Sequence, residues 1–231
     1  MNLFCIPFAG GSSYSYKGLS DRLHTLVSVD TLELPGRGLR FSESLLSDSR
    51  AMTDDLYNQI KTGLHEPYAL YGHSLGALLA FLLARQLVDK RQQKPLYLFL
   101  SGCEAPSVLP RQKRHLLPKN EFRDVIRRFG GCSPEVLDNE ELMEIFEPVL
   151  REDFKAYETY VHDAGSKLDV PIALMTGDEE ELERDDLMRW QAETTSKISI
   201  ETFPGDHFFI YRHWDKIAAL ISGALNLPEL H

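Results

Sequence analysis

The sequence predicts an α/β fold, with a mainly parallel sheet, helices on both faces and a helical insertion. Short apolar runs alternate with longer segments in which apolar residues recur at helical spacing, the pattern of βαβ units. The run 95–100 is continuously apolar, as expected of a strand buried on both faces. Between 106 and 165 the alternation breaks and helical segments follow one another. We expect residues 1–231 to form a single domain in which about 106–165 make a helical cap.

The first part of the chain predicts two strands, each followed by a helix. Residues 2–6 form a short apolar run that stops at a proline and the loop FAGGSS. From about 16 to 26, leucines recur at helical spacing. Residues 27–34 alternate like a strand and end at the breaker cluster PGRG. A helix is expected from about 48 to 64, because apolar residues there recur at every fourth position.

The remaining elements complete the alternation. A short strand at 68–71 precedes a strongly apolar helix at 75–91. After the insertion come two more strands, 170–175 and 198–203, and an amphipathic closing helix from about 214 to 225. An all-helical insertion in such a chain is expected at the C-terminal edge of the sheet, where ligands bind.

Composition excludes several classes of protein. The 25 basic and 35 acidic residues give a net charge of −10, which argues against non-specific nucleic-acid binding. The three cysteines form neither a disulfide framework nor a CxxC metal site, so we expect no metal and a reducing compartment. The N-terminus lacks the basic region of a signal peptide, and the apolar stretch 75–84 is far short of the ~20 residues that span a bilayer. A cytoplasmic protein without membrane association is expected.

The strongest local pattern is Gly72-His73-Ser74-Leu75-Gly76, which lies between a predicted strand and a predicted helix. In that context GxSxG forms a nucleophile elbow, a sharp turn that exposes the serine. Glycines on both sides let backbone segments approach closely, and the helix N-terminus places partial positive charge near an oxygen that becomes anionic. The pattern predicts Ser74 as a catalytic nucleophile.

A serine hydroxyl needs a base, and His207 is the expected one. It follows the strand 198–203 and precedes the closing helix, which is the position of the base in this architecture. His213 is the alternative if His207 is not the base, although it falls near the start of that helix.

Asp178 is the expected acid that orients the base, because it directly follows the strand 170–175. The chain order is then nucleophile, acid, base, as expected for this architecture. Other carboxylates remain open as the orienting acid: the neighbouring Glu179, Glu180 and Glu181, and Glu104 after the strand 95–100.

An oxyanion hole requires two backbone N–H groups. One is expected from Leu75, the residue after the nucleophile. The second is expected from the loop after the first strand, with Ala9 as the preferred donor and Phe8 as the alternative. The site therefore predicts acyl transfer or hydrolysis through an acyl-serine.

The chain resembles the type II thioesterases, stand-alone editing enzymes of non-ribosomal peptide and polyketide assembly lines with the α/β-hydrolase fold. The resemblance covers essentially the whole chain and rests on motifs at its start, in the predicted cap and around the three predicted catalytic residues. These are Cys5-Ile6-Pro7-Phe8-Ala9-Gly10-Gly11, Leu34-Pro35-Gly36-Arg37-Gly38, GHSLG, Phe129-Gly130-Gly131, Pro134-Glu135-Val136-Leu137, Leu150-Arg151-Glu152-Asp153 with Tyr157 and Tyr160, Gly177-Asp178 and His207-Phe208-Phe209. Such proteins often have a glycine where this chain has Asp206, which puts a carboxylate beside the base.

The resemblance implies hydrolysis of acyl or aminoacyl thioesters on the phosphopantetheine arm of carrier-protein domains, without a cofactor. It assigns Ser74 as nucleophile, His207 as base and Asp178 as acid. Two alternatives remain open. One is a carboxylesterase or acyltransferase that uses the same triad, and the other is a hydrolase-fold binding module without catalysis.

The charge distribution suggests where a carrier domain docks. Basic residues dominate from Arg111 to Arg128, in the predicted cap, whereas the protein as a whole is acidic. Carrier domains of the implied family are acidic, so a basic rim would steer one surface towards them. Arg123, Arg127 and Arg128 are the expected docking residues, and a merely solvated helix face is the alternative.

Overall fold

The predicted strands form one parallel sheet in the computed structural model, which describes residues 1–109 and 112–227. Arg111 of the basic segment lies outside the described residues. The strand order is β2-β1-β3-β4-β5-β6, and every neighbouring pair is parallel. The strands are β1 (Asn2–Ile6), β2 (Ser28–Thr31), β3 (Tyr68–His73), β4 (Leu98–Ser101), β5 (Ile172–Gly177) and β6 (Ile198–Phe203).

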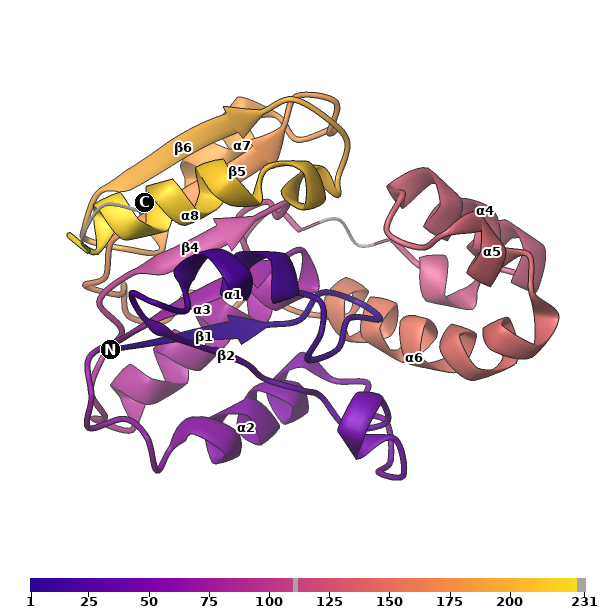
Figure 1. The fold of residues 1–231 in the computed structure, drawn as a ribbon, viewed down its shortest axis with the longest axis horizontal. Coiled ribbons are helices and arrows are strands. Elements are labelled where there is room, and N and C mark those ends of the chain that lie inside the picture. Colours follow the sequence, from indigo (N-terminus) through magenta and orange to yellow (C-terminus); the bar gives the residue numbers. More distant parts are fainter. Residues whose placement is uncertain (110–111, 228–231) are drawn as a thin grey trace.

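Helices cover both faces of the sheet (Figure 1). On one face lie α1 (Lys17–Leu23) and α8 (Trp214–Ala224), and on the other lie α2 (Ser49–Ile60) and α3 (Leu75–Asp89). Successive strand residues point to opposite faces, so β1 divides its side chains between two cores. Leu3 and Cys5 pack in the core under α1 and α8, whereas Phe4 and Ile6 pack in the core under α2 and α3. A short helix, α7 (Arg184–Met188), follows β5 and was not expected from the sequence.

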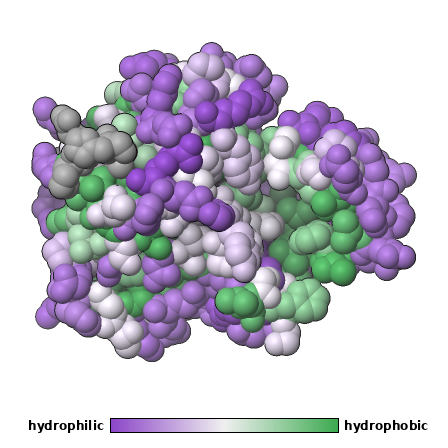
Figure 2. All heavy atoms as spheres, viewed as in Figure 1, coloured by the Kyte–Doolittle hydropathy of each residue, from purple (hydrophilic) through white to green (hydrophobic). Residues whose placement is uncertain are grey.

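The insertion forms the predicted helical cap over the C-terminal ends of the strands (Figure 1). It consists of α4 (Lys119–Phe129), α5 (Pro134–Leu137) and α6 (Glu140–Glu158). These helices share a small core of their own, made by Phe122, Ile126, Leu137, Met143 and Leu150. Figure 2 shows apolar surface gathered in the hollow between this cap and the body of the molecule. The cap therefore adds an apolar wall to the sheet edge.

The strand order reverses direction between β1 and β3, which lie side by side in the sheet. In open parallel sheets, ligands bind at the carboxyl ends of the strands on either side of such a switch point. The loops after β1 and β3 contain the two motifs FAGG and GHSLG. None of the helices in the described ranges is both long enough and apolar enough to cross a membrane.

Candidate active site

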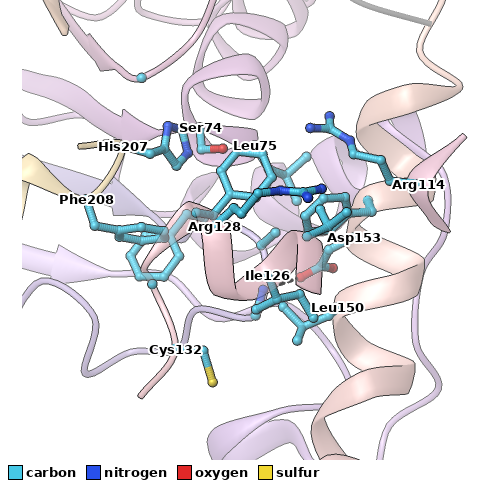
Figure 3. A pocket seen from close by; sticks show the side chains of 18 of the residues that line it. Ser74, Leu75, Arg114, Ile126, Arg128, Cys132, Leu150, Asp153, His207 and Phe208 are labelled. Carbon is cyan, nitrogen blue, oxygen red and sulfur yellow. Dashed lines mark hydrogen bonds between the residues drawn. The ribbon is translucent and has the colours of Figure 1, made fainter. Parts of the chain in front are cut away.

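Ser74 occupies a sharp turn between β3 and α3, as the motif predicts. Its backbone has φ 55° and ψ −121°, a left-handed conformation that is uncommon outside glycine. The turn is held in place by a hydrogen bond from the Ser74 backbone N–H to Ser101 O at 2.8 Å. Strain of this kind is typical of functional sites, and here it leaves the Ser74 hydroxyl facing the pocket (Figure 3).

The two flanking glycines are required by close backbone contacts. A Cβ atom on Gly72 would lie 2.1 Å from Gly76 O, across the turn itself. A Cβ atom on Gly76 would lie 2.2 Å from Ile6 O, at the end of β1. The turn can therefore close only because Gly72 lacks a side chain, and it can lie against the end of β1 only because Gly76 lacks one.

His207 lies beside Ser74 at one end of the pocket (Figure 3). It follows β6, as expected, and its side chain is 15% exposed. Its Nδ1 lies 2.6 Å from Oε1 of Glu180. A carboxylate at Nδ1 fixes the imidazole so that Nε2 is free to accept a proton from the serine. His213, the alternative base, instead places Nε2 2.8 Å from Pro204 O.

The acid beside the base differs from the one expected. Asp178 is exposed, and its Oδ1 accepts a hydrogen bond from the Gly205 backbone N–H at 2.8 Å. The chain turns after β5, with the Glu180 N–H reaching Gly177 O, and this turn brings Glu180 back over the strand end. Glu180 Oε2 then accepts from the Gly177 N–H at 2.7 Å. The expected contact between Asp178 and His207 is thus corrected: Glu180 makes it.

The other carboxylates near the site have separate roles. Glu104 lines the pocket, and burial raises its pKa. Asp206, the carboxylate that replaces the usual glycine, accepts from the Phe208 N–H and from Arg212 at 3.0 and 2.9 Å. Neither carboxylate has a hydrogen bond to His207 among the described contacts.

A second imidazole lies behind the base. His73 is fully buried, its ring centroid is 4.7 Å from that of His207, and its Nδ1 lies 3.0 Å from Ser101 Oγ. Burial, and then the charge that His207 can carry, hold the pKa of His73 well below its ordinary value. Gly102 (φ +59°) presses against both rings, since a Cβ atom there would lie 2.6 Å from His73 Cε1 and 3.0 Å from His207 Cε1. The ring of His207 therefore packs against the neutral ring of His73 and the backbone of Gly102.

Both expected oxyanion-hole donors line the pocket with Ser74. Leu75 begins α3, so its N–H has no acceptor within the helix. Ala9 follows β1 in the neighbouring loop, and its N–H has no acceptor among the described residues. Phe8, the alternative, also lines the pocket, and its N–H likewise has no acceptor among the described residues. The N–H groups of Leu75 and Ala9 thus come from the loops that follow two adjacent strands, β3 and β1.

The residues of the site line a cavity of about 840 Å³ that lies between the body of the molecule and the cap. Its wall is mostly apolar on the cap side, where α4 and α6 supply Val125, Ile126, Phe129, Phe146, Leu150 and Phe154. The Phe129 ring meets the His207 ring edge-on at 5.0 Å, so the cap contacts the base directly. The cavity therefore offers space for an apolar group next to Ser74 (Figure 3).

Comparison with known proteins identifies the family. The family model for the thioesterase domain matches residues 1–225. This chain belongs to the thioesterase family. It is 33% identical over 213 residues to the gramicidin S biosynthesis protein GrsT of Aneurinibacillus migulanus, covering 91% of this chain and 83% of that protein. Because the family acts on thioesters, this thioesterase is a hydrolase of thioester bonds.

Solved structures agree with that assignment and with the α/β-hydrolase fold. ClbQ from the colibactin NRPS/PKS pathway has a TM-score of 0.91 and 34% identity to this thioesterase, over 97% of this chain and 96% of that one. The type II thioesterase BorB from the borrelidin biosynthetic cluster has a TM-score of 0.87 and 33% identity, over 97% and 92%. The likeness extends through the cap as well as the sheet.

The three expected docking arginines of this thioesterase differ in exposure. Arg123 is only 8% exposed and is paired with Glu140 at 2.5 Å, so its charge is engaged within the cap, which does not support the expected docking role. Arg127 is exposed but bridges two aspartates of the cap. Arg128 is exposed and lines the cavity, and it has no acidic partner among the described residues. No cluster of metal-ligating side chains is found within residues 1–109 and 112–227.

Proposed function

We propose that this thioesterase hydrolyses acyl and aminoacyl thioesters from the phosphopantetheine arm of carrier proteins, and so clears stalled or mis-primed peptide and polyketide assembly lines. One observation carries the proposal: Ser74, His207 and two free N–H groups meet at the end of an 840 Å³ cavity that the cap walls with apolar side chains. The pathway names of ClbQ and BorB support it.

The acylation step uses three side chains. His207 Nε2 takes the proton of Ser74 as its oxygen attacks the thioester carbonyl carbon. Glu180 holds the imidazole and stabilises the imidazolium that forms, which is the role that sequence analysis expected of Asp178. The carbonyl oxygen becomes negative and is bound by the N–H groups of Leu75 and Ala9.

The intermediate then collapses and is hydrolysed. The carbon–sulfur bond breaks, the imidazolium gives its proton to the sulfur, and the pantetheine thiol leaves. Water next gives a proton to His207 and attacks the acyl-serine ester. Breakage of that ester returns the proton to Ser74 Oγ and releases the free acid.

We propose Arg128 as the docking residue that remains of the three. It combines exposure, a place at the cavity wall and freedom from an acidic partner. Charge reversal, Arg128→Glu, should lower kcat/KM for an acylated carrier about tenfold, and should lower that for a small soluble thioester much less. Arg127→Glu is the matched control on the same helix. Equal loss on both substrates would remove the docking role.

The reaction itself is tested on a carrier domain loaded with several acyl groups. Mass spectrometry before and after exposure to the thioesterase should show the carrier returning to its free thiol form. Ser74→Ala should abolish this change. A wild-type protein that leaves every acyl carrier intact but rapidly hydrolyses p-nitrophenyl esters would contradict the proposal and favour a carboxylesterase.

We also place this activity in the cytoplasm. The three cysteines are free in the structure, with Cys5 and Cys103 buried. Free thiols persist in a reducing compartment. Fractionation of cells that produce the tagged protein tests this placement, and recovery outside the cytoplasmic fraction would contradict it.

A further inference from the structure

Two motifs that carry no catalytic side chain meet beside the oxyanion-hole loop. Arg37 comes from the LPGRG turn after β2, and Asp153 comes from α6 in the cap. Their side chains form a bidentate ion pair, with Arg37 Nη1 to Asp153 Oδ2 at 2.5 Å and Nη2 to Oδ1 at 2.8 Å. Arg37 is 6% exposed and Asp153 is 0% exposed, so the pair is buried.

The same carboxylate holds the backbone of the loop that supplies Ala9. The Gly10 N–H donates to Asp153 Oδ2 at 2.7 Å, which fixes the peptide plane between Ala9 and Gly10. The preceding peptide plane, which carries the Ala9 N–H, is fixed through its carbonyl, because Phe8 O accepts from the Gly11 N–H at 2.8 Å. The Ala9 donor is thus held by one bond within the loop and one bond from the cap.

Packing reinforces this contact from the same helix face. Leu150 precedes Asp153 by three positions, so both side chains leave α6 on one side. A Cβ atom on Gly10 would lie 2.6 Å from Leu150 Cδ2, and Gly10 has φ +74°. The helix therefore touches bare backbone at Gly10, and the loop is pressed between α6 and the sheet.

We propose that Asp153, held by its ion pair with Arg37, is a positioning residue of this thioesterase. It fixes the orientation of the Ala9 N–H that binds the oxyanion. The geometry of the oxyanion hole therefore depends on the position of cap helix α6. Asp153 acts through Gly10 and does not act on the substrate itself. A buried carboxylate is costly unless it is paired and hydrogen-bonded, and this one has three donors. The inference rests on the proposed acyl-serine mechanism but not on the identity of the carrier.

Loss of the contact between Asp153 and Gly10 should weaken binding of the transition state, in which the oxyanion forms, and should leave binding of the substrate nearly unchanged. A donor that is misplaced by about 1 Å costs roughly 100-fold in rate, and loss of one oxyanion donor costs about 10²–10³ in kcat. Asp153→Asn removes the charge that grips Arg37 and weakens the bond to Gly10. We expect kcat for a p-nitrophenyl ester to fall about 10- to 100-fold per active site, with KM within about threefold of wild type.

The test separates positioning from a general loss of stability. Active sites are titrated, so that kcat refers to folded enzyme only. The inhibition constant of a phenylboronic acid is measured in parallel, because its tetrahedral adduct with Ser74 uses the oxyanion hole. It should rise by the same factor as kcat falls. The pH profile of kcat should keep its position, since the contact between His207 and Glu180 is untouched.

The matched control is Asp55→Asn. Asp55 also binds an arginine of the same turn, Arg40, in bidentate fashion at 2.6 and 2.8 Å, but it makes no hydrogen bond to residues 8–11. This variant should keep kcat per active site. If Asp153→Asn folds poorly, Arg37→Lys tests the clamp, because lysine keeps the charge without the two-pronged geometry.

The proposal is overturned if Asp153→Asn and Arg37→Lys both match Asp55→Asn in kcat per active site and in boronic acid affinity, whatever their melting temperatures. Boronic acid binding needs no turnover of a carrier, so a wrong carrier assignment would leave this result intact. Failure of the proposed function and failure of the clamp are therefore seen in different measurements.

Discussion

Glu180 Oε1 lies 2.6 Å from Nδ1 of His207, and no other carboxylate oxygen among the described residues is hydrogen-bonded to that nitrogen. The glutamate side chain is 4% exposed. Its second oxygen is held by the Gly177 N–H at the end of β5. The base is therefore anchored to the strand end through one carboxylate, and the exposed Asp178 is left to brace the neighbouring turn at Gly205.

Glu180→Gln should lower kcat by about 10⁴, because an amide at this position no longer fixes the tautomer or stabilises the imidazolium. Asp178→Asn should cost less than tenfold, since it weakens one bond to backbone. Both are measured with a p-nitrophenyl ester under saturating conditions. The reverse ranking of the two variants would restore Asp178 as the orienting acid.

His207→Ala should lower kcat by several powers of ten, about as much as Ser74→Ala, because members of a triad act as a unit. His213→Ala should stay within a few-fold of wild type, as its ring is engaged with Pro204 O. Single-turnover acylation rates measure both. A loss of only a few-fold in the His207 variant would mean that another base serves Ser74.

Buried His73 should make stability depend on pH. Its folded-state pKa is lowered, by burial first, so the unfolded state binds the proton more readily. The contribution of His73 to the free energy of unfolding is complete above the pKa of a histidine in the unfolded chain, about 6.5, and is lost as the pH falls below that value. Urea unfolding at pH 5.5 should show about 1 kcal/mol more loss, relative to pH 7.5, in wild type than in His73→Gln.

An exposed histidine provides the control for that experiment. His24 lies on the surface beside the carbonyl of Asp21. His24→Gln should keep the wild-type difference between the two pH values. If His73→Gln lost as much free energy of unfolding between pH 7.5 and pH 5.5 as wild type does, groups other than His73 would be responsible for the loss of stability in acid.

Gly76→Ala should destabilise the fold by about 3 kcal/mol, since its Cβ would lie 2.2 Å from the carbonyl oxygen of Ile6. Gly223→Ala is the opposite case, because no atom lies within 4 Å of a Cβ atom there. That variant should gain about 0.5–1 kcal/mol from helix propensity. Urea denaturation measures both, and equal effects would refute the steric argument.

Periodicity located the sheet because burial and strand pairing coincide for most of it. They separate at β2, which was expected at 27–34 and ends at Thr31. The Leu32 N–H still donates to Cys5 O of β1 at 2.9 Å, but the paired register ends at Thr31. Leu34 continues the apolar pattern because it packs, like Leu32, in the core under α2 and α3. Helix α2 likewise stops at Ile60 although Leu64 is buried, since the Gly63 N–H closes a turn onto Ile60 O.

The site could be predicted where a motif determines backbone geometry. Strand, glycine and helix together place Ser74, and the loop after β6 places His207. The acid could not be chosen, because Asp178 and Glu180 share one loop and a single turn decides which of them faces the imidazole. The docking role predicted for Arg123 is not supported for a related reason. Its partner Glu140 lies on a later helix, and a count of charges along one segment does not reveal such a pair.

Gly102 offers a means of disabling the enzyme without replacing a catalytic residue. Any methyl group at this position would intrude on the rings of His73 and His207 and would strain a backbone at φ +59°. Ser74, Glu180, Leu75 and Ala9 would be unchanged in sequence, whereas the ring of the base would be displaced. Gly102→Ala is therefore suited to trapping a loaded carrier on an otherwise intact active site, so that the complex can be visualised before the thioester is cut.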